Sequence, residues 1–177
     1  MAGNLRSELG MAIKRILVPV DFSAPSMAAL DYAVDFARPL NAELVVEFVV
    51  EPIYSITSGD LYAPSAELGY LMQEQRHQGK EQLAQMEARL KKRYRKIRTI
   101  LEDGLAYQAI VATAKKLKVD LIVMATHGRT GLSHLFMGSV AEKVVRSAGC
   151  PVLTVRVPEA RRRRPKKRAA RQHDPGK

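Results

Sequence analysis

The chain has 177 residues, of which 46% are hydrophobic, and its formal net charge is +11. This length and composition favour one globular domain with its own core, and no apolar run approaches the roughly 20 residues that span a bilayer. The N-terminus lacks the apolar segment of a secretory signal, and the lone Cys150 excludes an intrachain disulfide, so we expect a cytoplasmic protein.

The positive charge is concentrated at the C-terminus. Residues 159–177 hold nine Lys and Arg against two acids, a surplus of seven that leaves only four for the rest of the chain. We therefore expect a flexible N-terminus at 1–12, a folded domain at 13–158 and a basic disordered tail at 159–177. Such a tail attracts phosphate backbones without sequence preference, which predicts weak nucleic-acid contact, although it can equally serve only as a solubilising segment.

The first half of the chain alternates between strand and helix patterns. Residues 14–21 form an apolar run typical of a central parallel strand, in which Pro19 predicts the strand's end or a bulge because it donates no ladder hydrogen bond. Asp21 then lies at the carboxyl end of that strand, where open α/β sheets bind ligands. Ser23 is the expected N-cap of a helix that reaches Pro39, and a second strand follows at 43–50.

The next elements repeat this alternation. Residues 52–67 have the composition of a loop, and a long amphipathic helix follows, with Gly79 as a weak position. Its expected apolar face comprises Leu68, Leu71, Met72, Gln75, Gly79, Leu83, Met86 and Leu90. A third strand is expected at 97–101 and a helix at 106–117, so the order of elements predicts a parallel sheet.

The stretch from Asp120 to Val145 combines a buried strand at 121–124, a glycine-rich loop and a helix at 140–148. Glycines let the backbone approach a ligand, and free N–H groups at a helix N-terminus bind anions, so this order predicts an anion site. The loop has neither the Lys of a P-loop nor a GxGxxG pattern. Its spacing is Gly128, nine residues, then Gly138-Ser139, and a last strand follows at 151–157.

That spacing, together with the segments ILVPVDFS and CPVLTVRV, resembles the universal stress protein family over residues 14–157. The first glycine of the family's nucleotide loop falls on Ala125. The resemblance implies a single-domain α/β fold, Rossmann-like and similar to the adenine nucleotide α-hydrolases. Its five-stranded parallel sheet would have the strand order 3-2-1-4-5, with helices on both faces. It also implies regulatory binding of an adenine nucleotide, ATP, with or without Mg²⁺.

The resemblance assigns the ligand contacts to three places in the chain. Adenine and ribose would meet Pro19, Val20 and Asp21, and Val49 would line the adenine pocket. Ribose and phosphates would meet Met124, Ala125, Gly128, Gly138, Ser139 and Val140, with His127 and Arg129 in the same loop. Each position also has a structural explanation, since Asp21 can start a turn and Ser139 with Glu142 has the spacing of a capping box.

Three other functions remain open at this stage. The chain can be a stress protein without nucleotide, an accessory protein that binds polyanions through its tail, or an enzyme of the α-hydrolase type, although VDFSAPS lacks that type's glycines. We expect no dedicated enzyme and at most slow ATP hydrolysis, because no Walker Lys or paired carboxylate is evident. His127 and His134 stand apart from any Cys/His cluster, so no metal site is expected.

The last strand predicts assembly. A terminal apolar strand at a sheet edge leaves unpaired N–H and C=O groups, which a second copy can satisfy by antiparallel pairing about a two-fold axis. We therefore expect a homodimer through the strand at Val152–Val157, in a register that the sequence leaves open.

Overall fold

The computed structural model describes residues 12–52, 66–126 and 137–156. Several predictions consequently lie outside the described residues, among them the N-terminus up to residue 11, most of the loop at 52–67, and the basic tail with its expected nucleic-acid contact. None of the helices that the structure does describe is both long and apolar enough to cross a membrane.

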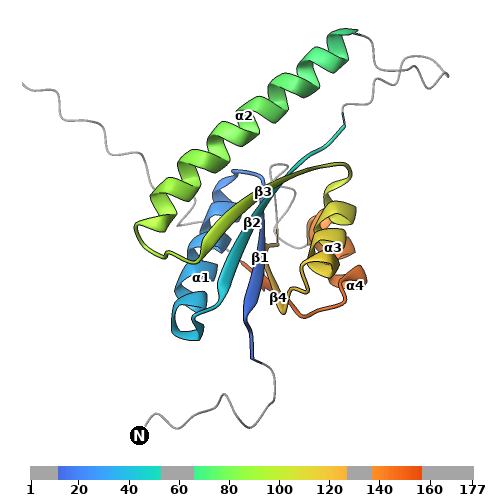
Figure 1. Cartoon of the computed structure of the whole chain (residues 1–177). Coiled ribbons are helices and arrows are strands. Elements are labelled where there is room, and N and C mark those ends of the chain that lie inside the picture. The colour runs from blue at the N-terminus through green and yellow to red at the C-terminus, as the bar shows by residue number, and fades with distance from the viewer. Residues whose placement is uncertain (1–11, 53–65, 127–136, 157–177) are drawn as a thin grey trace, which may run out of the picture.

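Strands and helices alternate along the chain, as the sequence predicts (Figure 1). The elements are β1 Arg15–Val20, α1 Ala24–Leu40, β2 Glu43–Val50, α2 Ala66–Lys91, β3 Ile97–Asp103, α3 Ala106–Lys116, β4 Leu121–Ala125, α4 Ser139–Ser147 and β5 Val152–Val155. The strands form one parallel sheet in the order β3-β2-β1-β4-β5, which confirms the predicted strand order.

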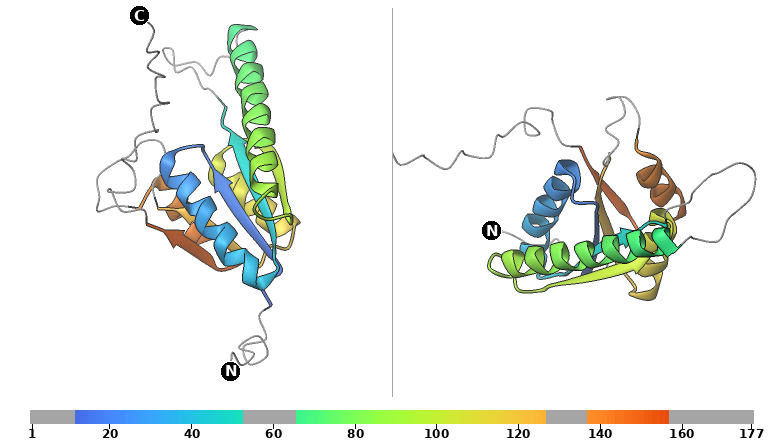
Figure 2. Two further views of the ribbon diagram at one scale, coloured as in Figure 1. Left: turned by 90° about the vertical axis from the view of Figure 1, so that its left-hand side faces the viewer. Right: turned by 90° about the horizontal axis from the view of Figure 1, so that it is seen from above.

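Helices cover both faces of the sheet (Figures 1 and 2). Helices α1 and α2 pack on one face, in a core that includes Val18, Leu30 and Val46, and α3 and α4 pack on the other, around Leu17, Ile110 and Ile122. Strands β1, β2 and β4 are apolar on both faces because both faces are buried. The chain leaves β1 towards β2 and β3 and then returns to β4 on the other side of β1, so the strand order reverses between β1 and β4.

Pro19 lies inside β1 as its penultimate residue. The carbonyl of Arg15 accepts a hydrogen bond from the Asp120 N–H at the start of β4, 3.0 Å away, and alternate residues of a strand share a side. The backbone nitrogen of Pro19, which carries no hydrogen, therefore faces β4. Pairing of β1 with β4 extends only to Leu17, whereas pairing with β2 continues to Val20. The two strands consequently part at their carboxyl ends.

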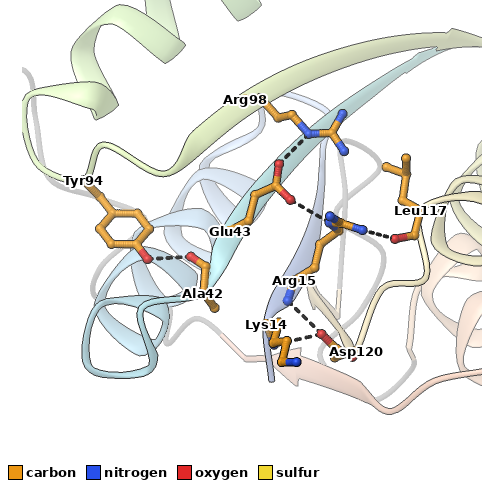
Figure 3. Close-up of polar contacts among 8 residues, drawn as sticks. All are labelled: Lys14, Arg15, Ala42, Glu43, Tyr94, Arg98, Leu117 and Asp120. Carbon is orange, nitrogen blue, oxygen red and sulfur yellow. Dashed lines mark hydrogen bonds and ion pairs between the residues drawn. The ribbon is translucent and has the colours of Figure 1, made fainter. Parts of the chain in front are cut away.

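The amino ends of the strands are held together by charged side chains (Figure 3). The Asp120 carboxylate accepts from the backbone N–H groups of Lys14 and Arg15, both at 2.8 Å. The Glu43 carboxylate lies between the guanidinium groups of Arg15, at 2.6 Å, and Arg98, at 2.7 Å. Burial alone would raise the pKa of Glu43, but these two partners outweigh it and lower that pKa. This network joins β1 to β4 at the amino ends of the strands, opposite their carboxyl ends.

The apolar face that the sequence predicts for helix α2 is buried only in the second half of the helix. Leu83, Met86 and Leu90 are buried, whereas Leu71 is 45% exposed and the prediction for that residue is wrong. The cause is geometric, because the first turns of α2 extend past the sheet, where nothing in the described fold covers them (Figures 1 and 2).

Gly79 is buried where α2 packs against the side chain of Phe48 in β2. A Cβ atom at this position would lie 2.6 Å from Cε1 of Phe48, whose ring in turn packs against Phe22 with centroids 4.8 Å apart. The weak position in the helix sequence is therefore a packing requirement, since only glycine leaves room for the Phe48 ring.

We expect Gly79→Ala to destabilise the protein by about 1 kcal/mol, because the steric cost of an added methyl, roughly 1–3 kcal/mol, exceeds the helix propensity it gains. The matched control is Gly69→Ala in the same helix, where an added Cβ meets nothing within 4 Å. That control should raise the free energy of unfolding or leave it unchanged. Urea unfolding of both variants measures the difference, and equal effects would contradict the packing role of Gly79.

Candidate functional site

A cavity of about 400 Å³ lies over the carboxyl ends of the strands, where β1 and β4 part. Its walls come from three strands, from the start of α4 and from α1, α2 and α3. The residues from the strand ends and α4 are Pro19, Val20, Asp21, Glu47, Phe48, Val49, Glu51, Met124, Ala125, Thr126, Gly138, Ser139, Val140 and Ala141. The reversal of strand order is the usual ligand position in open α/β sheets.

The structure brings nine of the eleven predicted site residues together in this cavity. They are Pro19, Val20, Asp21, Val49, Met124, Ala125, Gly138, Ser139 and Val140. Gly128 and Arg129, with the neighbouring His127, lie outside the described residues. Positions more than a hundred residues apart in sequence thus converge, while their contacts with a ligand stay a prediction.

The N-terminus of α4 opens onto the cavity. Gly138 is the N-cap and Ser139 is the first helical residue, so the capping box with Ser139 as the cap is wrong. The Gly138 N–H donates to the Thr126 carbonyl at 2.7 Å, which fixes the start of the helix beside the end of β4. Because the first N–H groups of a helix have no intrahelical partner, the first turn presents donors and a partial positive charge.

Asp21 occupies the turn between β1 and α1. Its carboxylate accepts from the Ser23 N–H at 2.9 Å, and its own N–H donates to the Ser26 hydroxyl at 3.3 Å. Phe22 between them has a φ of 61°, in the left-handed region. Ser23 is the N-cap of α1, as predicted. Asp21 therefore starts the turn, as its structural explanation requires, and it also lines the cavity, while its contact with a ligand stays a prediction.

Glu47 is a cavity residue that sequence reasoning missed. It lies in the middle of β2, is 0% exposed, and points to the α3 side of the sheet, where its Oε1 accepts from the Thr113 hydroxyl at 2.7 Å. Its Oε2 has no hydrogen-bond partner among the described residues. Burial raises the pKa of Glu47 to about 7, and the charge of Glu102 adds to this. The available signal was one acid inside the apolar run ELVVEFVV.

The described part of the cavity wall is acidic. Asp21, Glu47 and Glu51 line it, and no Lys or Arg does so within residues 12–52, 66–126 and 137–156. Gln75 of α2 also lines it, with a buried Oε1 that has no hydrogen-bond partner in the same ranges. Across those residues there is no cluster of three His, Cys, Asp or Glu able to hold a metal ion.

Comparison with known proteins gives consistent matches. The model of the universal stress protein family matches residues 12–156. A universal stress protein of Methanocaldococcus jannaschii is 34% identical over 148 residues, which are 82% of this chain and 84% of that protein. The structure of universal stress protein UspA from Lactobacillus plantarum has a TM-score of 0.72 and 27% identity, and covers 81% of this chain and 98% of its own.

A further solved structure, described as a universal stress protein in complex with cAMP, has the same fold. Its TM-score is 0.55 at 24% identity, with 81% of this chain and 97% of that chain covered.

Glu47 gives the folded protein a distinctive pH dependence. The unfolded chain, with its ordinary Glu pKa of 4.5, loses this proton first, so between pH 4.5 and about 7 the folded state holds more protons. The free energy of unfolding therefore falls as pH rises through this window, by about 3 kcal/mol at ~1.4 kcal/mol per pKa unit.

We expect Glu47→Gln to remove this contribution, so that the variant is more stable than the wild type at pH 8 and close to it at pH 4.5. Urea unfolding at both pH values measures the change. Glu81→Gln, which alters an exposed carboxylate in α2, is the control and should keep the wild-type pH dependence. If the free energy of unfolding of Glu47→Gln changed with pH as that of the wild type does, the Glu47 carboxyl would not be the cause of the pH dependence.

Proposed function

Because the chain belongs to the universal stress protein family, we propose that it binds an adenine nucleotide, ATP, as a regulatory ligand in a stress response. The observation that carries this proposal is the cavity between β1 and β4, where nine predicted contact positions meet the N-terminus of α4. A universal stress protein of the same fold is described in complex with cAMP, which supports a nucleotide as the ligand class.

The phosphates would lie at the start of α4. Gly138, Ser139 and Val140 line the cavity there, and the free N–H groups of the first helical turn donate to anionic oxygens. Glu51, an acidic group elsewhere in the described wall, would repel phosphate. Charge therefore favours a ligand with its phosphates at α4 and its base away from it.

The base and ribose would occupy the part of the cavity formed by β1 and β2. Val49, Ile110 and Met124 supply apolar surface for a planar base. Asp21, held in place by the Ser23 N–H, supplies a carboxylate beside them that can accept from a sugar hydroxyl. Ala125, at the family's first glycine position, is buried at the end of β4 and lines the same wall.

We propose a regulatory role and no dedicated hydrolysis. A general base must reach the water that attacks a phosphate. Glu47 lies in the middle of β2 and has no exposed surface from which to reach such a water. Any Mg²⁺ that accompanies ATP would be held mainly by the phosphates, because the described residues supply no three-ligand cluster.

We also propose that the protein assembles as a homodimer through β5. This strand is at the sheet edge and pairs only with β4 among the described strands. It ends at Val155, two residues short of the predicted end, because the last hydrogen bond from the β4 end, Thr126 N–H to Val155 carbonyl at 3.2 Å, falls there.

The ladder also sets the direction of the free edge. The carbonyls of Pro151 and Val155 accept hydrogen bonds from the β4 side, and alternate residues share a side. Val152 and Thr154 therefore turn their N–H and C=O groups away from β4, towards a second copy.

The nucleotide proposal predicts that ATP raises the melting temperature. A ligand at about 100 times its Kd stabilises the native state by ~2.7 kcal/mol, or about 5–10 °C for a domain of this size. Gly138→Val should abolish the shift and keep the fold, since the Gly138 φ of −60° and ψ of 147° suit valine and its added bulk falls in the cavity wall. Absence of binding in wild-type calorimetry at millimolar ATP would overturn the proposal.

The dimer proposal predicts a mass near twice 19.7 kDa by light scattering at micromolar concentration. Thr154→Pro removes an N–H on the free edge and should yield monomers, with circular dichroism confirming that the sheet is retained. Thr154→Val, which keeps the backbone donor, is the matched control and should stay dimeric. A monomeric wild type would refute the interface, and a dimeric Thr154→Pro would place it elsewhere.

A further inference from the structure

The carboxyl of Glu47 is a polar group inside the cavity wall that the fold itself does not use fully. Within the part of the chain that the structure describes, only one of its oxygens has a hydrogen-bond partner, the Thr113 hydroxyl of α3, although the residue has no exposed surface. A buried polar atom without a hydrogen bond is unfavourable, because it has lost its contacts with water and gained no partner in exchange. A sequence that needed only core packing here would place another aliphatic residue at this position, as it does at Val45 and Val49 on the same face of β2.

The surroundings of Glu47 favour its neutral form. Glu102 of β3 opposes ionisation, and Thr113 of α3 is a neutral donor. Asp21 after β1 and Glu51 after β2 line the same cavity and are acidic, while α2 contributes the neutral Gln75. The contributions of β4 and α4 to the described wall carry no charge. A bound phosphate would add negative charge and shift the balance further towards the protonated acid.

The proton of the neutral acid has one available position. Because the Thr113 hydroxyl donates to Oε1, Oε2 is the oxygen that carries the proton and becomes a donor. Glu47 lies beneath the surface of the wall, so Oε2 reaches a ligand by rotation of the side chain. That rotation breaks no hydrogen bond of Oε2 but moves Oε1 as well, so the hydrogen bond gained at Oε2 must outweigh any weakening of the 2.7 Å contact between Oε1 and the Thr113 hydroxyl.

We propose that Glu47 is a specificity-determining residue for the base of the bound nucleotide, donating from Oε2 to an acceptor atom on the base ring. The inference rests on the proposed nucleotide binding and assigns one contact within it. In the proposed binding mode the phosphates would lie at the start of α4, so the group nearest β2 would be the base. A neutral acid in an apolar wall that donates to a ring nitrogen discriminates bases by that nitrogen's position, because a base lacking the acceptor leaves the donor unpaired.

The proposal ties binding to a proton. If the protein binds the ligand only when Glu47 is protonated, its affinity for the ligand is constant well below pH 7 and falls about tenfold for each pH unit above it. Glu47→Gln carries an N–H donor in place of the O–H and cannot ionise. It should bind as the wild type does at pH 6 and lose the decline that Glu47 causes at higher pH. Glu47→Leu offers no donor and should bind at least tenfold more weakly at pH 6.

Calorimetric titration of ATP from pH 5.5 to 8.5 tests these expectations. The terminal phosphate of ATP also titrates near neutral pH, so the difference between wild type and Glu47→Gln is the relevant quantity. Glu81→Gln removes an exposed carboxylate outside the cavity and should keep the wild-type profile. Tripolyphosphate, which has no base, separates base contact from charge repulsion, and Glu47→Leu should bind it as the wild type does at pH 6.

Each outcome decides between the alternatives. Identical pH profiles for wild type and Glu47→Gln, or full ATP affinity in Glu47→Leu, would overturn the inference and leave nucleotide binding in place. A loss of tripolyphosphate binding in Glu47→Leu equal to the loss of ATP binding would do the same. No binding of ATP by the wild type would overturn the proposed function itself, and this inference with it.

Discussion

The separation of β1 from β4 at their carboxyl ends is the constraint on which the rest of the site depends. Polar groups hold the same strands together at the amino edge, where Asp120 binds the backbone of Lys14 and Arg15. At the other end, Pro19 offers no N–H on the β4 side, and the ladder has ended at Leu17. A strand pair fixed at one end and open at the other creates a crevice without any break in the core beneath it.

Most of the fold follows from local patterns in the sequence. Apolar runs bounded by turn residues predict the strands, and their regular alternation with helices predicts a parallel sheet, because each helix carries the chain back across the sheet to start the next strand in the same direction. The ends of elements depend on partners far away in sequence, and there the predictions were less accurate. Leu71 is exposed because α2 extends past the sheet, and β5 stops at Val155 because this residue pairs with Ala125, the last residue of β4.

The candidate site was predictable where the family motif covers it and not elsewhere. Ser139 illustrates a local pattern that misleads, since the capping-box spacing to Glu142 is present while Gly138 holds the cap. Glu47 illustrates a residue without a local pattern. Its burial, its single hydrogen bond and its place in the cavity wall all come from Thr113 and other residues distant in sequence, so only the folded structure shows that this acid differs from a surface one.

The overhang of α2 gives one helix two regimes of stability. From Gly79 onward the helix is fixed to Phe48 and the core, whereas the turns before Gln75 rely on their own backbone hydrogen bonds. Short unsupported helical turns open and close readily, so backbone amides there should exchange with solvent fast and those after Gly79 slowly. Gln75 lies at the boundary and lines the cavity. A molecule that contacts Gln75 would extend the stable part of α2 towards its N-terminus. Slower amide exchange in α2 would therefore report that the cavity is occupied, although other elements form most of it.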